Sequence, residues 1–145
     1  MMTKTIGILF SSFILGCVSE DPADSDATTQ ALSDDFTVHT TDSGVCGSGG
    51  GGSVQFVDNG PAGDDYVVIH DLCSDGHGVK AYAWINGEYF GSMYNGNGLA
   101  GAAVTWHPWN NVFDGESVGL KVCLVDGNND PTASSCGSAT KVIHE

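Results

Sequence analysis

The chain has 145 residues, of which 18 are Asp or Glu, four are Lys or Arg and 21 are Gly, and its formal net charge is −14. This charge excludes a nucleic-acid binder, because binding to phosphates needs a basic surface. The share of hydrophobic residues, 41%, is sufficient to build a core. The length suits one domain, and the high share of glycine favours turns and strands over long helices.

The first 16 residues are predicted to be a signal peptide. Lys4 supplies a positive charge, and the apolar run of residues 6–15 is too short to span a bilayer. The run ends in the sequence ILGC at Cys17, which resembles the lipobox of bacterial lipoprotein signal peptides. The resemblance implies that Cys17 carries the lipid, including palmitate, and anchors the protein in the cell envelope, in the outer membrane if the organism is Gram-negative. The alternative is an ordinary secreted protein.

Residues 17–33 are predicted to form an acidic, disordered tether between the lipid and a domain at 34–145. The tether contains Glu20, Asp21, Asp24 and Asp26 and lacks aromatic residues. Such a segment buries too little apolar surface to offset the conformational entropy that folding would cost.

From Phe36 onward, apolar residues recur at every second position, which predicts β-strands. The sequence Asn86-Gly87 predicts a tight hairpin turn, because both positions of a type I′ turn need a positive φ. About eight short strands favour an all-β fold, an antiparallel β-sandwich with Ig-like or jelly-roll-like topology. The predicted strands lie near residues 36–38, 54–56, 65–73, 79–85, 89–94, 99–107, 118–124 and 138–144.

Four cysteines remain once Cys17 is set aside, an even number that suits disulfides in an oxidising compartment. Of the three possible pairings we favour Cys46–Cys73 and Cys123–Cys136, because the second would clamp the loop of a hairpin. A structural zinc site is disfavoured, because the chain has no CxxC pair.

The segment from Asp64 to Val125 also resembles small exported proteins of actinobacteria. The resemblance rests on the stretches DGHGVKAYAWINGEYFGSMYNGNG and VGLKVCLVDG. It implies an exported, disulfide-bonded β domain and leaves the function open.

Asp126, Asn128 and Asp130 alternate in the sequence DGNNDP, which resembles the start of a calcium-binding loop. Pro131 and Gly137 stand where an EF-hand needs Gly and Glu, so a simpler calcium-binding turn is the hypothesis. The alternative is an ordinary hairpin loop rich in Asn, Asp and Gly. Calcium is therefore a possible cofactor, and no other cofactor is expected.

His70, Asp71, Asp75 and His77 gather around Cys73 and suggest a transition-metal site or acid–base chemistry. The spacing of metal-binding histidines on a helix is missing, so a strand histidine followed by a turn is the competing interpretation.

Aromatic residues give the strongest indication of ligand binding. An aromatic row on one face of a sheet could stack against sugar rings, whereas the same side chains could instead fill the core. The candidate ligand-binding residues are Tyr82, Trp84, Tyr89, Tyr94, Trp106 and Trp109.

Nothing in the sequence identifies catalytic residues, since it has no GxSxG nucleophile motif. The prediction is a lipid-anchored, non-enzymatic binding module whose partner is an unknown protein or glycan. The acidic chain favours a cationic partner. The alternatives are a carbohydrate-binding module and a small secreted hydrolase or inhibitor.

Overall fold

The computed structural model describes residues 34–42, 46, 50–60 and 63–144. The predicted signal peptide, Cys17 and the predicted tether therefore lie outside the described residues. Within the described part of the chain, no helix has the length and apolar character that crossing a membrane requires.

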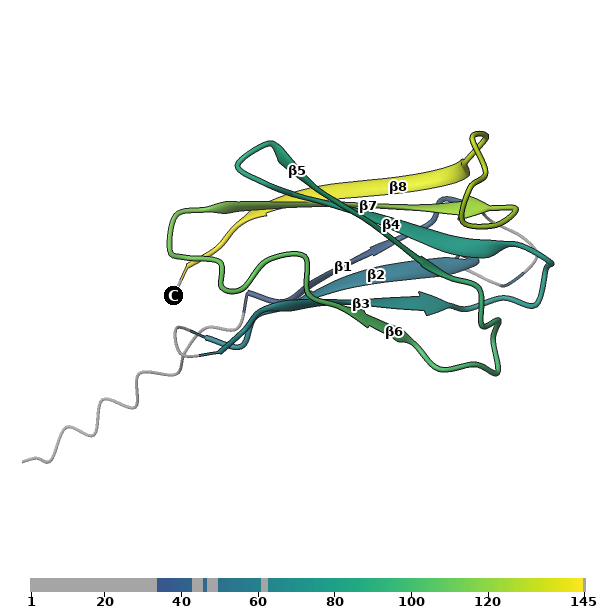
Figure 1. Ribbon diagram of the computed structural model, residues 1–145, viewed down its shortest axis with the longest axis horizontal. Helices are drawn as coiled ribbons and strands as arrows, with labels where there is room; N and C mark the ends of the chain where they lie inside the picture. Colours follow the sequence, from purple (N-terminus) through teal and green to yellow (C-terminus); the bar gives the residue numbers. More distant parts are fainter. Residues whose placement is uncertain (1–33, 43–45, 47–49, 61–62, 145) are drawn as a thin grey trace, which may run out of the picture.

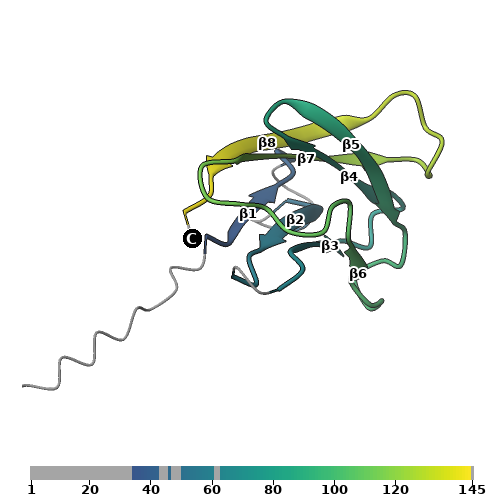
Figure 2. The ribbon, with the colours of Figure 1, turned by 60° about the vertical axis from the view of Figure 1, so that its left-hand side comes forward.

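Two antiparallel four-stranded sheets pack face to face, which confirms the predicted disulfide-bonded β-sandwich (Figure 1). One sheet has the order β1-β2-β3-β6, and the other has the order β5-β4-β7-β8 (Figure 2). The strands are β1 (Phe36–His39), β2 (Gly52–Val57), β3 (Tyr66–Asp71), β4 (Gly78–Ile85), β5 (Glu88–Asn95), β6 (Val104–Trp106), β7 (Ser117–Val125) and β8 (Ser134–Val142).

The hairpin between β4 and β5 turns where the sequence predicts it, with φ values of 51° at Asn86 and 83° at Gly87. The strand predicted over 99–107 is shorter in the structure, because a turn precedes β6. In this turn Gly101 N donates to Gly98 O at 2.9 Å. Conversely, β8 begins four residues before the predicted strand at 138–144.

The core lies between the sheets and is built from alternate residues of each strand. On β4 the inward residues are Ala81 and Ala83, which are fully buried, so Tyr82 and Trp84 point to the outer face. The other buried core residues on strands include Val54, Phe56, Val67, Ile69, Val79, Val118, Leu120 and Val122.

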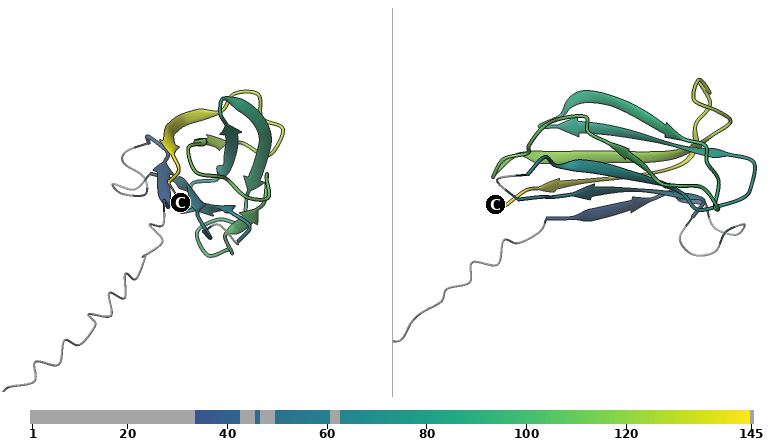
Figure 3. Two further views of the ribbon diagram at one scale, coloured as in Figure 1. Left: turned by 90° about the vertical axis from the view of Figure 1, so that its left-hand side faces the viewer. Right: turned by 60° about the horizontal axis from the view of Figure 1, so that its bottom comes forward.

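The sandwich is nearly closed along one side, where β1 approaches β8 (Figure 3). Thr41 N donates to Ser135 O at 2.9 Å just beyond β1. The two disulfides are Cys46–Cys73 and Cys123–Cys136, the pairs favoured from the sequence. Cys73 and Cys123 are both buried, so each disulfide ties a loop or strand end to the core.

Asp34 joins the beginning of the domain to its end. Its carboxylate accepts a hydrogen bond from the backbone N of His144 and lies 2.8 Å from Lys141 Nζ. Burial by itself would raise the pKa of Asp34, but Lys141 and His144 outweigh it and lower the pKa below the ordinary value of 3.8.

We expect Asp34→Asn to destabilise the domain by about 2 kcal/mol at neutral pH, since it removes hydrogen bonds to a buried carboxylate. A lowered carboxyl pKa contributes stability above pH 3.8 that is lost as the pH falls through the folded-state pKa. The difference between wild type and variant should therefore shrink below pH 3.8, as measured by urea unfolding. Glu88→Gln, which removes a charge from an exposed position, is the control. An effect of Asp34→Asn that is the same at pH 7 and pH 2 would contradict this account.

Candidate functional site

A polar cluster forms at the end of the sandwich where β4 begins and β7 ends. The two strands pair in a register that sets Gly78 opposite Val125. His77 comes directly before Gly78, and Asp126 comes directly after Val125, so the pairing of the two strands brings these residues together. His77 Nε2 lies 3.3 Å from Asp126 Oδ1.

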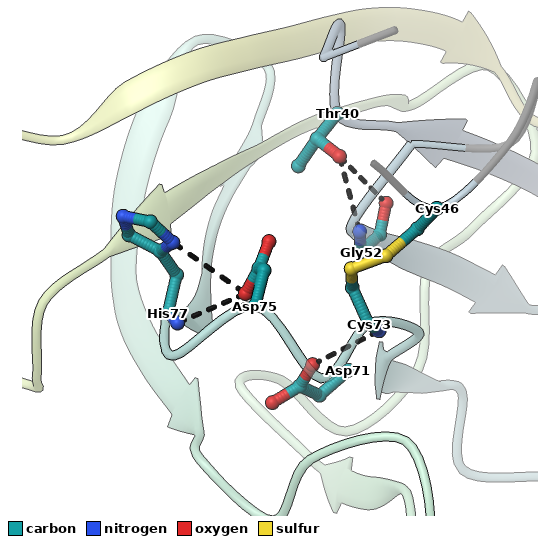
Figure 4. Close-up of a disulfide and its surroundings, with 7 residues drawn as sticks. All are labelled: Thr40, Cys46, Gly52, Asp71, Cys73, Asp75 and His77. Carbon is teal, nitrogen blue, oxygen red and sulfur yellow. Dashed lines mark hydrogen bonds and ion pairs between the residues drawn. A yellow bond between two sulfur atoms is a disulfide. The ribbon is translucent and has the colours of Figure 1, made fainter. Parts of the chain in front are cut away.

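Asp75 holds the other side of the imidazole. Its Oδ1 lies 3.5 Å from His77 Nδ1 and also accepts a hydrogen bond from His77 N at 2.9 Å (Figure 4). Gly76 between them has a φ of 88°, which a residue with a side chain rarely adopts and which allows this tight turn. The Asp75 side chain is 11% exposed, whereas that of Asp126 is 73% exposed. The histidine is therefore held by one sheltered and one solvent-facing carboxylate.

The Cys46–Cys73 disulfide lies beside Asp75, as Figure 4 shows. A carboxylate oxygen of Asp75 and the two sulfur atoms lie within 4.8 Å of one another. Because the sulfurs are bonded to each other, they are not free to act as thiolate ligands of a metal. The disulfide instead fixes the loop that carries Asp75 and His77.

Asp42 is a third carboxylate at this end of the sandwich. The site of a hypothetical Cβ on Gly51 is 3.2 Å from Asp42 Oδ2 and 3.3 Å from Asp75 Oδ2. Burial would raise the pKa of Asp42, but hydrogen bonds from Thr40 and Gly51, together with the charge of His77, lower it below its ordinary value. No pattern in the sequence marks Asp42 as part of this cluster.

The loop between β7 and β8 completes the cluster. Asp130 Oδ2 accepts from Asp126 N at 2.8 Å, and its Oδ1 accepts from Thr132 N at 2.7 Å. These hydrogen bonds lower the pKa of Asp130. Lys80 Nζ donates to Asn128 O at 2.6 Å. Both carboxylate oxygens of Asp130 and the backbone oxygen of Asn128 thus already have partners within the protein.

A hollow of about 300 Å³ opens beside His77 and Asp126. Its other walls include Asp71, Tyr94 and Asn97. Asp71 has a structural role here, because its carboxylate accepts hydrogen bonds from Cys73 N and Gly98 N.

The structure therefore unites parts of two candidate sites that the sequence suggests separately. Asp75 and His77 come from the first, and Asp126 comes from the second. His70 lies on β3 opposite Ser53 and does not line the hollow.

The predicted aromatic residues separate into different places. Trp84 contacts Tyr82 and Tyr89 on the outer face of the sheet, with ring centroids 6.3 and 5.5 Å away. Trp109 is 8% exposed and packs against Phe56 in the core, so it is not part of that surface.

The two remaining aromatic candidates are not in contact with Trp84 in the same way, although Tyr94 pairs with Lys80 on the same sheet. Trp106 belongs to β6 in the opposite sheet. Tyr94 lines the hollow beside His77.

No protein-family model matches this chain, and no curated protein matches it. Among solved structures, the crystal structure of endonuclease/exonuclease/phosphatase from Beutenbergia cavernae DSM 12333 is similar, with a TM-score of 0.54 and 19% sequence identity. The match covers 75% of this chain and 26% of the other, so the chain spans about a quarter of that protein's length.

This comparison contradicts the prediction of a non-enzymatic binding module, because the similar fold occurs within a protein that is named as an enzyme. The sequence prediction rested on the absence of a nucleophile motif, and a catalytic site assembled from separate loops needs no such motif. At this level of identity the likeness establishes the fold, and the activity is a subject for proposal.

We expect Ca²⁺ at about 1 mM, a concentration that saturates many extracellular calcium modules, to leave the melting temperature unchanged. Binding at Asp126, Asn128 and Asp130 would have to displace the hydrogen bonds that Asp130 already accepts. Differential scanning calorimetry with and without Ca²⁺ measures this. A clear upward shift that disappears in Asp130→Asn would instead establish the calcium loop predicted from the sequence.

Proposed function

We propose that this domain is a hydrolase that activates water at His77. The observation that carries the proposal is the position of the imidazole, which has Asp75 at one nitrogen and Asp126 at the other. The name of the structurally similar protein supports phosphoesters as the substrate class.

The two carboxylates suit different parts of this chemistry. Asp75 is sheltered and can keep the Nδ1–H of His77 in place, which leaves Nε2 to accept a proton from water. Asp126 is largely exposed and lies on the Nε2 side, where the hollow opens. Nε2 and Asp126 Oδ1 are 3.3 Å apart, so the attacking water molecule has to take the place of the exposed Asp126 carboxylate at Nε2. Asp126 would then accept a hydrogen bond from that water molecule.

The charge of the site limits how a phosphoester can approach. Asp75 and Asp126 lie beside His77, and Asp42 lies near Asp75, so that each of these carboxylates repels a phosphate. A divalent cation between these carboxylates and the phosphate would remove the repulsion. The assay of the proposed activity therefore includes Mg²⁺.

We expect the purified domain to hydrolyse bis(p-nitrophenyl) phosphate or p-nitrophenyl phosphate in the presence of Mg²⁺. His77→Gln should reduce kcat at least 100-fold, since general-base catalysis contributes roughly 10²–10⁴-fold. Release of p-nitrophenolate measures the rate.

His144→Gln is the matched control, because His144 also lies near a carboxylate, Asp114, at 3.8 Å but is 67% exposed. It should leave the rate unchanged. If the wild type releases no p-nitrophenolate, or if His77→Gln keeps the full rate, the proposed hydrolase is wrong.

We also propose that the protein is exported and anchored to the cell envelope through a lipid on Cys17. Two disulfides within the described residues support an oxidising compartment. The lipobox-like sequence ending at Cys17 supports lipidation, and two acyl chains hold a protein at a bilayer where one is marginal.

Cells fed radioactive palmitate should label the wild type, and Cys17→Ser should abolish the label because the acylated sulfur is gone. Autoradiography of the immunoprecipitated protein measures the label. Cys136→Ser, which changes a disulfide cysteine, should remain labelled as the control. An unlabelled wild type recovered from the cytosol would contradict both export and anchoring.

A further inference from the structure

The outer face of the β5-β4-β7-β8 sheet carries a second surface, far along the strands from His77. The register of β4 and β7 pairs Tyr82 with Lys121 and Trp84 with Gly119. The register of β7 and β8 then pairs Gly119 with Thr140. A glycine thus separates a tryptophan from a threonine in one row across the sheet.

Neither packing nor backbone geometry requires a glycine at position 119. A Cβ there would lie 3.5 Å from Trp84 Cβ and 3.5 Å from Thr140 Oγ1, which are ordinary van der Waals distances. Gly119 is also absent from the glycines with positive φ. A glycine inside a strand weakens the strand and often marks a place where a ligand approaches closely. Gly119 is itself buried between Trp84 and Thr140 and forms the bottom of a trough between these two side chains.

The trough has a volume of about 330 Å³ and two chemically different walls. Trp84 forms the aromatic wall. Outside the trough, the ring of Tyr82 stacks on Trp84 at an interplanar angle of 25°. Ser138 and Thr140 supply hydroxyl groups on the other side. A ligand that fits both walls has an apolar face and a polar edge.

The charge around the trough differs from that of the whole chain. None of the described residues that line it is a carboxylate, although the chain has 18 Asp and Glu. Lys121 lines it instead, with Nζ 5.4 Å from the centroid of the Tyr82 ring. This lysine disfavours a cationic ligand and offers a donor to a hydroxyl or carboxylate.

We propose that this trough binds a pyranose ring of a polysaccharide, with the face of the sugar against Trp84 and its hydroxyls toward Thr140, Ser138 and Lys121. Sugar rings combine apolar C–H faces with polar edges, which matches the two walls. The site is separate from His77, so either site can exist without the other.

The proposal is tested by measuring whether the folded domain is retained on insoluble cellulose, xylan and chitin and on immobilised polygalacturonate. The wild type should bind at least one of these polysaccharides. Gly119→Ala should weaken that binding at least tenfold without lowering the melting temperature, because the added methyl group narrows the trough between Trp84 and Thr140 and lies at ordinary contact distance from both. Trp84→Ala should abolish binding.

Two controls separate this site from the rest of the molecule. Tyr66→Ala changes an aromatic residue on the other sheet and should bind as the wild type does. His77→Gln should also bind normally, which distinguishes failure of the glycan site from failure of the proposed hydrolase. Lys121→Gln should weaken binding to polygalacturonate more than to a neutral polysaccharide. If the wild type binds none of the four, or if Gly119→Ala binds as the wild type does, the proposed site does not exist.

Discussion

The pairing register of β4 with β7 is the constraint on which both candidate sites depend. It places Gly78 opposite Val125 at one end and Ile85 opposite Val118 at the other. At the first end the register brings His77 to Asp126. Further along, it sets Trp84 beside Gly119 and opens the trough. A shift of one residue would turn every side chain of β4 to the opposite face and would remove both arrangements at once.

The burial of Ala81 and Ala83 fixes that register. These small side chains are fully buried in the core, and the large rings of Tyr82 and Trp84 stay on the outer face. Reversing the faces would expose Val79 and Ile85 and force the two rings between the sheets. The hydrophobic effect therefore favours the observed arrangement, in which Val79 and Ile85 are buried. The aromatic surface is a consequence of how the core is packed.

Buried carboxylates hold loops of the sandwich in place through hydrogen bonds to the backbone. Asp65 is fully buried, and its two oxygens accept hydrogen bonds from Asn59 N and Val112 N at 2.9 and 2.7 Å. Burial raises the pKa of Asp65 even though these bonds favour its charged form. The residue ties two loops to the sheet, as Asp34 ties the beginning of the domain to its end. In this acidic chain, some of the carboxylates thus have structural roles and others gather at the His77 cluster.

The sequence by itself determined the fold class, the hairpin at Asn86-Gly87 and most strand positions, because these follow from local periodicity and turn chemistry. It also marked Asp75 and His77 as parts of one candidate site and Asp126 as part of another. Only the tertiary structure decided that His77 meets Asp126, that Asp42 joins them and that Trp109 is buried while Trp84 is not. Residues 49 positions apart come together through strand pairing, and which face of a strand is buried depends on the opposing sheet. Neither is encoded in the residues adjacent to each side chain.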